Sequence, residues 1–242
     1  LDEALAGLYS ANIQGLNVTV PFKIEVLNYV VDLTLEARKI GAANLLIRGE
    51  QGWIGDNTDG RGFVQSLLGA GFNPAGKKAL LLGAGGAARA VGFGLLGADI
   101  DQLWLTNRTE ERAIDLQSIL ATAYQQKKVS VVEWKDREDL ELLRNMDLII
   151  NTTTVGMSAK SNEQPVVALD GLAGGQAVVA DIVYSPLQTP LILAAKANGL
   201  LTVTGDKMLL YQAVISWETW TKQKAPLTKM AQALADALYL AR

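Results

Sequence analysis

The chain has 242 residues, 49% of them apolar, so it can bury one large hydrophobic core or two smaller ones. Its 22 basic and 25 acidic side chains give a net charge of -3, which excludes the basic surface typical of a general nucleic-acid binder. The sequence contains no histidine and no cysteine, which excludes disulfides, thiolate metal sites and Ser-His-Asp catalysis, and we expect no metal site. General acid-base chemistry therefore depends on Lys, Asp, Glu or Tyr.

The residues before Gly69 predict a small α/β unit, because short apolar runs alternate with helical patterns. The predicted helices and strands are, in chain order, helix Ala4–Ala11, strand Leu16–Val20, helix Ile24–Ala37, strands Ala43–Arg48 and Trp53–Asn57, and helix Gly62–Leu68. We find no apolar run near the roughly 18 residues that a membrane span requires.

Two charged residues follow the ends of predicted strands in this unit. Lys23 follows Val20-Pro21, and Asp59 follows the strand that ends at Asn57. A proline ends a strand because it fixes φ and lacks the N–H of the ladder, so we expect Lys23 on an exposed rim. Asp59 is placed in the same way, with a glycine behind it. Either residue alone is also typical of a solvated loop charge.

From Ala79 to Val203 the pattern is that of a doubly wound parallel sheet covered by helices. A cluster of turn residues at 69–76 precedes it. The predicted strands are Ala79–Leu82, Gln102–Thr106, Val129–Glu133, Asp147–Asn151, Ala177–Asp181 and Leu200–Val203. Near the C-terminus, apolar residues recur at helical spacing from Leu227 to Leu238, and we expect this helix to pack back on the first unit.

The first predicted strand of this sheet runs into a glycine turn that opens a helix, Gly83-Ala84-Gly85-Gly86-Ala87. Such a turn lets backbone N–H groups approach a pyrophosphate, and small residues let helix and strand pack closely. The turn therefore predicts a dinucleotide site, although a purely structural turn remains the alternative.

The next strand indicates which dinucleotide is bound. NAD sites place an acid about 20 residues after the glycines, to bind the ribose hydroxyls. This chain has Asn107-Arg108-Thr109 there, with Arg112 one turn later. Two guanidinium groups favour a 2'-phosphate, so NADP is predicted over NAD. Glu110 and Glu111 weaken this local field, and a solvated helix start is the alternative for the two arginines.

Taken together, these segments resemble the shikimate/quinate dehydrogenase family over nearly the whole chain. The resemblance rests on segments in family order: 17–23, 41–44, Asp56-Asn57-Thr58-Asp59-Gly60, 83–87, 107–109, 151–157, 183–191 and 205–212. It implies an NADP-dependent, reversible reduction of 3-dehydroshikimate to shikimate in a cytoplasmic enzyme of aromatic amino-acid biosynthesis. It also implies a monomer or homodimer, with a small-molecule substrate and no nucleic-acid or membrane partner.

The resemblance assigns roles to individual residues. The catalytic pair matches Lys23 and Asp59, and the substrate contacts match Thr19, Asn44, Tyr184 and Gln212. The cofactor contacts match the 83–87 turn, Asn107, Arg108, Thr109 and Arg112 at the 2'-phosphate, and Thr153, Ile182, Gly205 and Met208 at the nicotinamide. We expect residues 1–60 and 213–242 to form the substrate-binding domain and residues 61–212 the NADP-binding domain.

Two departures from the family pattern leave alternatives open. Family members begin with a strand-helix-strand unit carrying a Ser-Leu-Ser-Pro-like segment, whereas this sequence starts at Leu1 in a helical pattern, and we expect weaker substrate binding without it. Leu45 replaces a threonine that the family usually has. The alternatives are a dehydrogenase that uses quinate and both NAD and NADP, or an inactive nucleotide-binding module.

Overall fold

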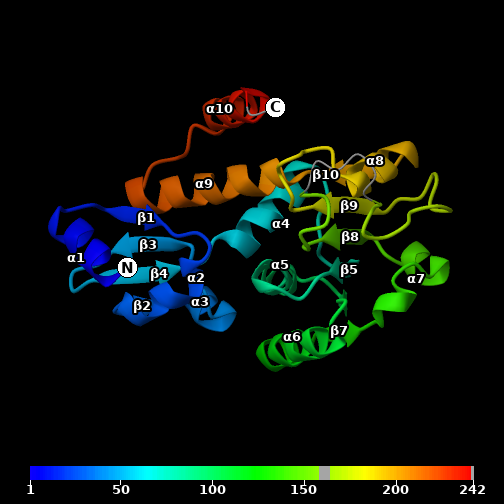
Figure 1. Ribbon diagram of the computed structural model, residues 1–242, viewed down its shortest axis with the longest axis horizontal. Helices are drawn as coiled ribbons and strands as arrows, with labels where there is room; N and C mark the ends of the chain where they lie inside the picture. Colours follow the sequence, from blue (N-terminus) through cyan, green and yellow to red (C-terminus); the bar gives the residue numbers. More distant parts are fainter. Residues whose placement is uncertain (158–163, 241–242) are drawn as a thin grey trace.

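The computed structural model describes residues 1–157 and 164–240 of the chain. Helix α4 (Asp59–Gly69) lies between two sheets, one of four strands and one of six, and helix α9 (Gly205–Thr221) runs above the four-stranded sheet towards the six-stranded one (Figure 1). Residues 158–163, within the predicted 61–212 unit, and residues 241–242, at the end of the predicted 213–242 segment, lie outside the described residues. No helix in the described ranges combines the length and apolar character needed to cross a membrane.

The six-stranded sheet is parallel throughout, as the sequence predicted, and has the order β10-β9-β8-β5-β6-β7. This is the strand order of a doubly wound dinucleotide-binding fold. The strands are β5 (Lys78–Leu82), β6 (Gln102–Thr106), β7 (Lys128–Val131), β8 (Leu148–Asn151), β9 (Val178–Asp181) and β10 (Leu201–Val203). Each lies within two residues of the range predicted for it.

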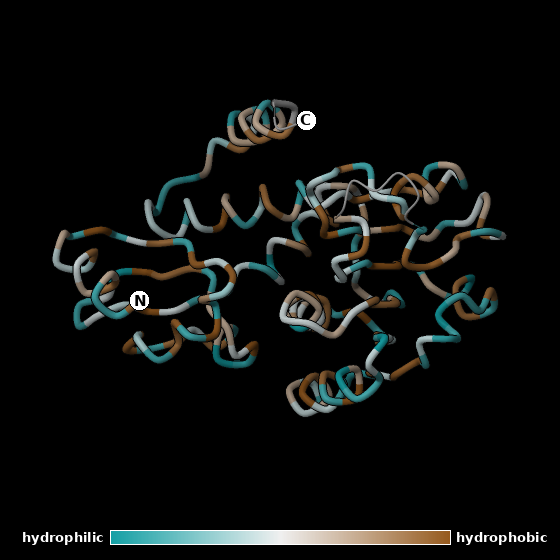
Figure 2. The backbone as a smooth tube through the Cα atoms, viewed as in Figure 1, coloured by the Kyte–Doolittle hydropathy of each residue, from teal (hydrophilic) through white to brown (hydrophobic). Residues whose placement is uncertain are grey.

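Helices cover both faces of this sheet, which explains why its strands are mainly apolar on both faces, with polar residues mostly at their ends. Leu81 faces the helices α5 (Gly86–Gly97) and α6 (Glu110–Ala123), and Leu80 faces α7 (Leu140–Arg144) and α8 (Pro190–Ala197). A short 3-10 helix, η2 (Trp134–Asp136), follows β7. Figure 2 shows the strands of this sheet as mainly hydrophobic segments within a more polar periphery.

The four-stranded sheet has the order β1-β3-β4-β2, in which only the β2/β4 pair is parallel. Its elements are α1 (Asp2–Ser10), β1 (Gly15–Asn17), α2 (Phe22–Glu25), the 3-10 helix η1 (Val26–Tyr29), β2 (Asp32–Leu33), α3 (Leu35–Ile40), β3 (Leu45–Arg48) and β4 (Trp53–Asp56). Its separate core contains Leu5, Val26, Leu46 and Trp53. The molecule therefore has distinct hydrophobic cores for its two sheets.

The predicted helix Ile24–Ala37 is wrong. The backbone leaves the helical region at Val30, and the following residues form β2, which pairs with β4. Thr34 then starts a new helix, because its hydroxyl accepts a hydrogen bond from the Ala37 N–H. The β-branched pair Val30-Val31 and the cap at Thr34 break the helical period, and pairing with β4 compensates for the lost helix.

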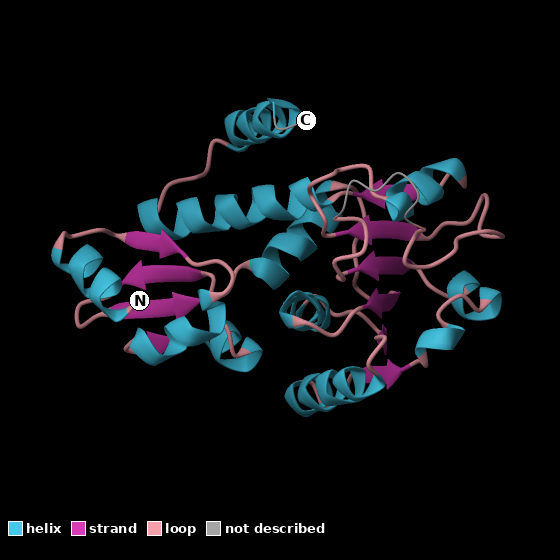
Figure 3. Cartoon of the chain, viewed as in Figure 1, coloured by secondary structure: helices cyan, strands magenta, loops and turns pink. Residues whose placement is uncertain are grey.

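Two further expectations also need correction. The strand predicted to reach Val20 ends at Asn17, so Lys23 lies on the short helix α2 and not directly beyond a strand end. Helix α10 (Leu227–Leu240) packs against α9, and Figure 3 shows it above α9 and apart from the four-stranded sheet. The expected packing of this helix on the first unit is therefore not what the structure shows.

Helix α4 connects the first unit, which contains the four-stranded sheet, to the second unit, which contains the six-stranded sheet. It packs against α5 and α9, and the contact with α5 requires glycine at position 60. A Cβ built on Gly60 would lie 2.4 Å from the Ala90 carbonyl oxygen. This close approach sets the N-terminus of α4, where Asp59 is located, beside the helix that follows the glycine turn.

Candidate active site

Lys23 and Asp59 form a direct ion pair. The Lys23 Nζ lies 2.7 Å from the Asp59 Oδ2, and the two side chains are 29% and 9% exposed. Asp59 is the first residue of α4, where the positive end of the helix dipole stabilises a carboxylate. The pair that the sequence separated by 36 positions is therefore a single, partly buried unit.

Asn44 holds the aspartate of this pair in place. Its Nδ2 donates to the Asp59 Oδ1 at 2.8 Å and to the Thr58 hydroxyl at 3.0 Å, while its Oδ1 accepts from the Thr58 N–H at 2.8 Å. The Asn57 Oδ1 accepts from the Asp59 N–H at 3.0 Å. Both oxygens of the carboxylate thus have fixed partners, which leaves it one orientation towards Lys23.

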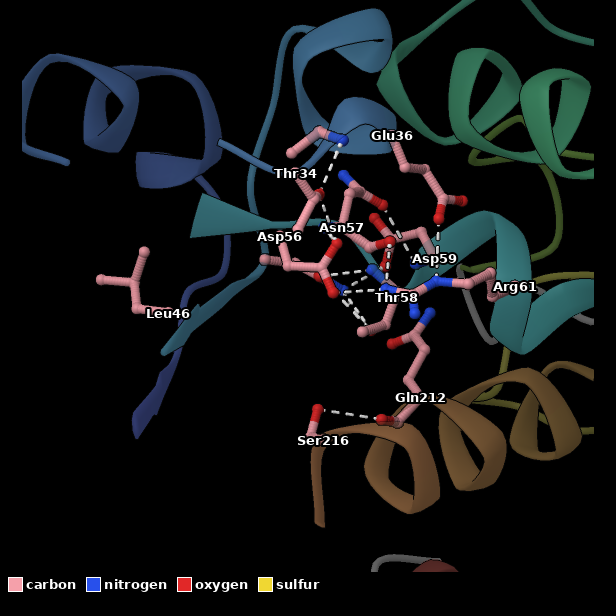
Figure 4. Close-up of polar contacts among 12 residues, drawn as sticks. Thr34, Glu36, Leu46, Asp56, Asn57, Thr58, Asp59, Arg61, Gln212 and Ser216 are labelled. Carbon is pink, nitrogen blue, oxygen red and sulfur yellow. Dashed lines mark hydrogen bonds and ion pairs between the residues drawn. The ribbon is translucent and has the colours of Figure 1, made fainter. Parts of the chain in front are cut away.

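A second charged cluster fixes the chain on either side of Asp59, through Asp56 and Arg61 (Figure 4). Arg61 donates to Asp56, and its Nε lies 2.8 Å from the Glu36 Oε2. The Thr34 hydroxyl donates to Asp56 at 2.6 Å. Burial raises the pKa of Glu36 above its ordinary value, and the neighbouring Arg61 opposes that shift. The cluster links α3 and β4 to the first turn of α4.

The glycine turn has the geometry that a dinucleotide phosphate requires. Gly83 has φ +113°, and a Cβ there would lie 2.7 Å from the Thr152 Oγ1, so a side chain is excluded. Gly85 is the N-cap of α5, and Cβ atoms built on Gly85 and Gly86 would meet nothing within 4 Å. The open side of the turn at the helix N-terminus leaves room for a phosphate to approach the backbone N–H groups.

One cavity of about 550 Å³ joins the ion pair to this turn. Its wall includes Lys23 and Asp59 from the first unit, the turn residues Ala84, Gly85, Gly86 and Ala87, and Arg112 from α6. The acid-base pair and the glycine turn therefore face the same space between the two sheets. This is the carboxyl edge of the parallel sheet, where ligands bind in doubly wound folds.

Asn107, Arg108 and Thr109 follow β6 at this edge, next to the turn that follows β5. Thr109 is the N-cap of α6, and the Asn107 Nδ2 donates to its carbonyl at 2.8 Å. The Arg108 and Arg112 side chains are exposed. This set offers two accessible guanidinium groups to an anion beside the turn.

Thr153, Ile182, Gly205 and Met208 come from three separate segments. A Cβ on Gly205 would lie 2.3 Å from the Ile182 carbonyl oxygen, so the start of α9 touches the loop after β9, and Met208 is buried one turn later. Thr153 follows β8, where its N–H and hydroxyl both donate to the Asn151 Oδ1. Ile182, Gly205 and Met208 thus lie together at the start of α9.

The remaining predicted substrate residues lie at different depths. Gln212 on α9 points towards Thr58 in Figure 4, and a Cβ on Gly62 would lie 2.8 Å from its Cγ. The Thr19 side chain is exposed, and the Thr19 carbonyl accepts from the Phe22 N–H. Tyr184 follows β9 and is 48% exposed. Asn44 and Gln212 are therefore close to the Asp59 end of α4, whereas Thr19 and Tyr184 lie on the surface.

Sequence reasoning missed several polar residues that shape the site. Asp181 is 2% exposed and accepts from the Asn151 side chain, the Val183 N–H and the Thr189 hydroxyl, so it ties the ends of β8 and β9 to α8. Burial raises its pKa. The pair formed by Arg61 and Glu36 was also missed. The sequence signal that could have identified Asp181 is an acidic residue at the end of an apolar strand.

Comparison with known families matches three separate stretches of the chain. Residues 1–46 match the family description "Shikimate dehydrogenase substrate binding domain", and residues 66–182 match "Shikimate / quinate 5-dehydrogenase". Residues 207–235 match "Shikimate 5'-dehydrogenase C-terminal domain".

Individual proteins show the same similarity. The chain is 41% identical to a protein from Moorella thermoacetica named shikimate dehydrogenase (NADP(+)), over 98% of this chain and 80% of that protein. A shikimate 5-dehydrogenase from Thermus thermophilus, solved with NADP(H) and shikimate, is 33% identical, with a TM-score of 0.84 over 98% of this chain and 84% of that one. A ligand-free 5-ketofructose reductase from a Gluconobacter species is 34% identical, with a TM-score of 0.89 over 97% and 83%.

Proposed function

The chain belongs to the shikimate/quinate dehydrogenase family, and we propose that it catalyses the NADP-dependent, reversible reduction of 3-dehydroshikimate to shikimate. The relatives named shikimate dehydrogenase (NADP(+)) support both the substrate and the cofactor. This reaction belongs to the biosynthesis of aromatic amino acids. Location in the cytoplasm and a monomer or homodimer state stay predictions of the sequence.

In this proposal Lys23 and Asp59 are the catalytic residues. When bound, NADPH supplies the hydride to the carbonyl carbon. The carbonyl oxygen then gains negative charge and needs a cation or a proton donor beside it. The Lys23 ammonium fills that role, and Asp59 at 2.7 Å orients it. In the reverse direction the same pair accepts the proton of the alcohol, as one coupled acid-base unit.

The substrate contacts extend outwards from this pair. Gln212 lies beside the Asp59 end of α4, so its amide can bind a ring hydroxyl next to the reacting carbon. The N–H groups of the Asn44 amide already bond to Asp59 and Thr58, so the contribution of Asn44 to substrate binding is mainly to orient these neighbours. We assign Thr19 and Tyr184 to the outer part of the substrate site, because both side chains are exposed. Solvent-accessible hydroxyl groups there can bind the polar substrate without an unpaired group being buried.

The residues present fit NADP. The open Gly85-Gly86 side of the turn fits the pyrophosphate, and Arg108, Arg112, Asn107 and Thr109 fit the 2'-phosphate. We assign Thr153, Ile182, Gly205 and Met208 to the nicotinamide. In this assignment the unit of the four-stranded sheet binds the substrate, and the unit of the six-stranded sheet binds the cofactor.

One observation carries the proposal: a charged lysine-aspartate pair and an open glycine turn line the same cavity of about 550 Å³. A solvated surface pair would not face a dinucleotide turn, and a purely structural glycine turn would not face an acid-base pair. This shared cavity supports a site in which a bound cofactor and the Lys23-Asp59 pair would act on one substrate.

The direct test compares substrates and cofactors by initial rates followed through NADPH absorbance. We expect turnover of shikimate with NADP+ and of 3-dehydroshikimate with NADPH, and much lower kcat/KM with quinate, 5-ketofructose or NADH. Lys23→Met should lower kcat by roughly 10²-fold or more, because a positioned proton donor contributes that much. Quinate turnover equal to that of shikimate would refute the substrate assignment.

The matched control is Lys77→Met. Lys77 pairs with Asp147 at 3.2 Å at the opposite end of β5, so its loss removes an ion pair without touching the cavity. We expect wild-type kcat from this variant. A wild-type kcat from Lys23→Met would refute the catalytic assignment.

A further inference from the structure

Arg89 makes a direct contact between the cofactor-binding helix and the first unit. It lies on α5, one turn beyond the glycine turn, and its Nη2 donates to the Lys39 carbonyl at 2.9 Å, across 50 positions of sequence. Lys39 belongs to the last turn of α3, where the carbonyl groups have no partner within the helix. The guanidinium therefore caps a helix of one unit from a helix of the other.

The capped end of α3 leads directly to the substrate residues. Gly41 has φ +69°, and a Cβ there would lie 3.2 Å from the Arg89 Nη2, so the guanidinium rests against glycine backbone. Three residues later Asn44 bonds to Asp59, which pairs with Lys23. A short path of backbone and hydrogen bonds thus runs from the glycine turn through Arg89 to the catalytic pair.

Lys39 supplies a second link between the units. Its Nζ lies 4.9 Å from the centre of the Tyr124 ring, and the Tyr124 hydroxyl donates to the Phe93 carbonyl on α5 at 3.4 Å. Lys39 therefore contacts the second unit with both its carbonyl and its ammonium group. These links join α3 to α5 directly and, through Tyr124, to the end of α6.

Arg89 is not explained by packing alone. Its Nε is buried without a hydrogen-bond partner among the described residues, and such a donor costs free energy. Burial also lowers the pKa of Arg89 from its ordinary value. Arg89 lines the cavity that holds the catalytic pair and the glycine turn. Because its unpaired Nε destabilises the fold, the presence of Arg89 in the lining of this cavity points to a role in the site.

We propose that Arg89 is a positioning residue that couples the binding of NADPH to the binding of shikimate. It does so by fixing the end of α3, and hence Asn44 and the catalytic pair, to the helix that carries the phosphate turn. The inference rests on the proposed function. A contact that is made when both sites are ordered raises the affinity for either ligand in the presence of the other, because coupling is reciprocal.

Calorimetry measures this coupling. The shikimate Kd is determined with the free protein and with its NADPH complex, which is a dead-end complex without turnover. We expect NADPH to tighten shikimate binding about 5-fold or more in the wild type, within the usual range of coupling. In Arg89→Ala the factor should fall below about 2-fold, with the separate affinities nearly unchanged, and Arg89→Lys should restore part of it.

Arg137→Ala is the matched control, since the Arg137 Nε also donates to a carbonyl, that of Val166, but within the second unit. It should keep the wild-type coupling factor. An unchanged factor in Arg89→Ala, a wild-type factor of one, or an Arg89→Ala loss confined to NADPH affinity alone would each overturn the proposal.

A distance measurement separates failure of this inference from failure of the proposed function. The sequence lacks cysteine, so Gln51→Cys in the turn between β3 and β4 and Lys128→Cys on β7, both at exposed positions, take one spin label each. Without ligand, the Arg89→Ala background should broaden the distribution of label distances, and the Arg137→Ala background should not. An unchanged distribution overturns the link whatever the substrate is, whereas absent shikimate binding with a broadened distribution overturns only the proposed function.

Discussion

Replacing Asp59 with asparagine removes one charge from the site and keeps the shape of the side chain. The asparagine oxygen can still accept from the Asn44 Nδ2, which lies 2.8 Å from the Asp59 Oδ1. The amide group that replaces Oδ2 would face the Lys23 ammonium, so the 2.7 Å contact loses its acceptor. A hydrogen bond to a charged group contributes about 1.5 to 3 kcal/mol, which corresponds to roughly 10 to 150-fold in rate.

We therefore expect Asp59→Asn to lower kcat for shikimate oxidation by about 10²-fold with a small change in KM, since the substitution breaks the pair that accepts the proton of the alcohol. The assay is initial rates at saturating NADP+ with varied shikimate. The fold should survive, because loss of one charge at a helix N-terminus costs about 0.3 to 1 kcal/mol and water can reach the partly exposed Lys23 in place of the lost contact. Thermal unfolding checks this.

Asp147→Asn serves as the matched control, because Asp147 accepts from Lys77 and from the Lys78 N–H outside the site. It should leave kcat unchanged. An Asp59→Asn enzyme with wild-type kcat and a raised KM would show that Asp59 binds substrate and does not act in the chemistry.

Two further predictions concern cofactor choice and pH. Arg108→Ala should weaken NADPH binding by about 1.5 to 3 kcal/mol and leave NADH unchanged in fluorescence titrations, because only NADPH carries the 2'-phosphate; equal losses for both cofactors would contradict the assignment. Burial raises the pKa of Glu36 in the folded protein above its ordinary value of 4.5. The protonated carboxyl therefore contributes its full stabilisation below pH 4.5, and this contribution is lost as the pH rises through the raised pKa. Urea unfolding at several pH values should show a smaller fall in unfolding free energy over that window for Glu36→Gln, and an identical fall would contradict the reasoning.

Local chemistry made the second unit predictable from sequence. Its strands are buried on both faces and therefore read as short apolar runs, and the glycine turn follows directly from the need for a backbone with positive φ at Gly83. Each of these signals is contained within a few neighbouring residues. The strand order then follows from the doubly wound pattern.

The first unit was less predictable because its short elements depend on partners far along the chain. Asp32 and Leu33 have no strong local preference for a strand, and they form β2 because β4 offers a parallel edge at Ile54 and Gly55. The same dependence misplaced Lys23, which the structure puts on α2. Local pattern could not supply these contacts.

The sequence by itself determined which chemical groups this protein can use: a chain without histidine or cysteine, with Lys23, Asp59 and a glycine turn followed by Asn107-Arg108-Thr109. Only the tertiary structure decided that Lys23 and Asp59 meet at 2.7 Å, that Asn44 orients the carboxylate, and that Arg89 reaches α3. The physical reason is that side-chain chemistry is local, whereas distances between residues tens of positions apart depend on how the helices and sheets pack.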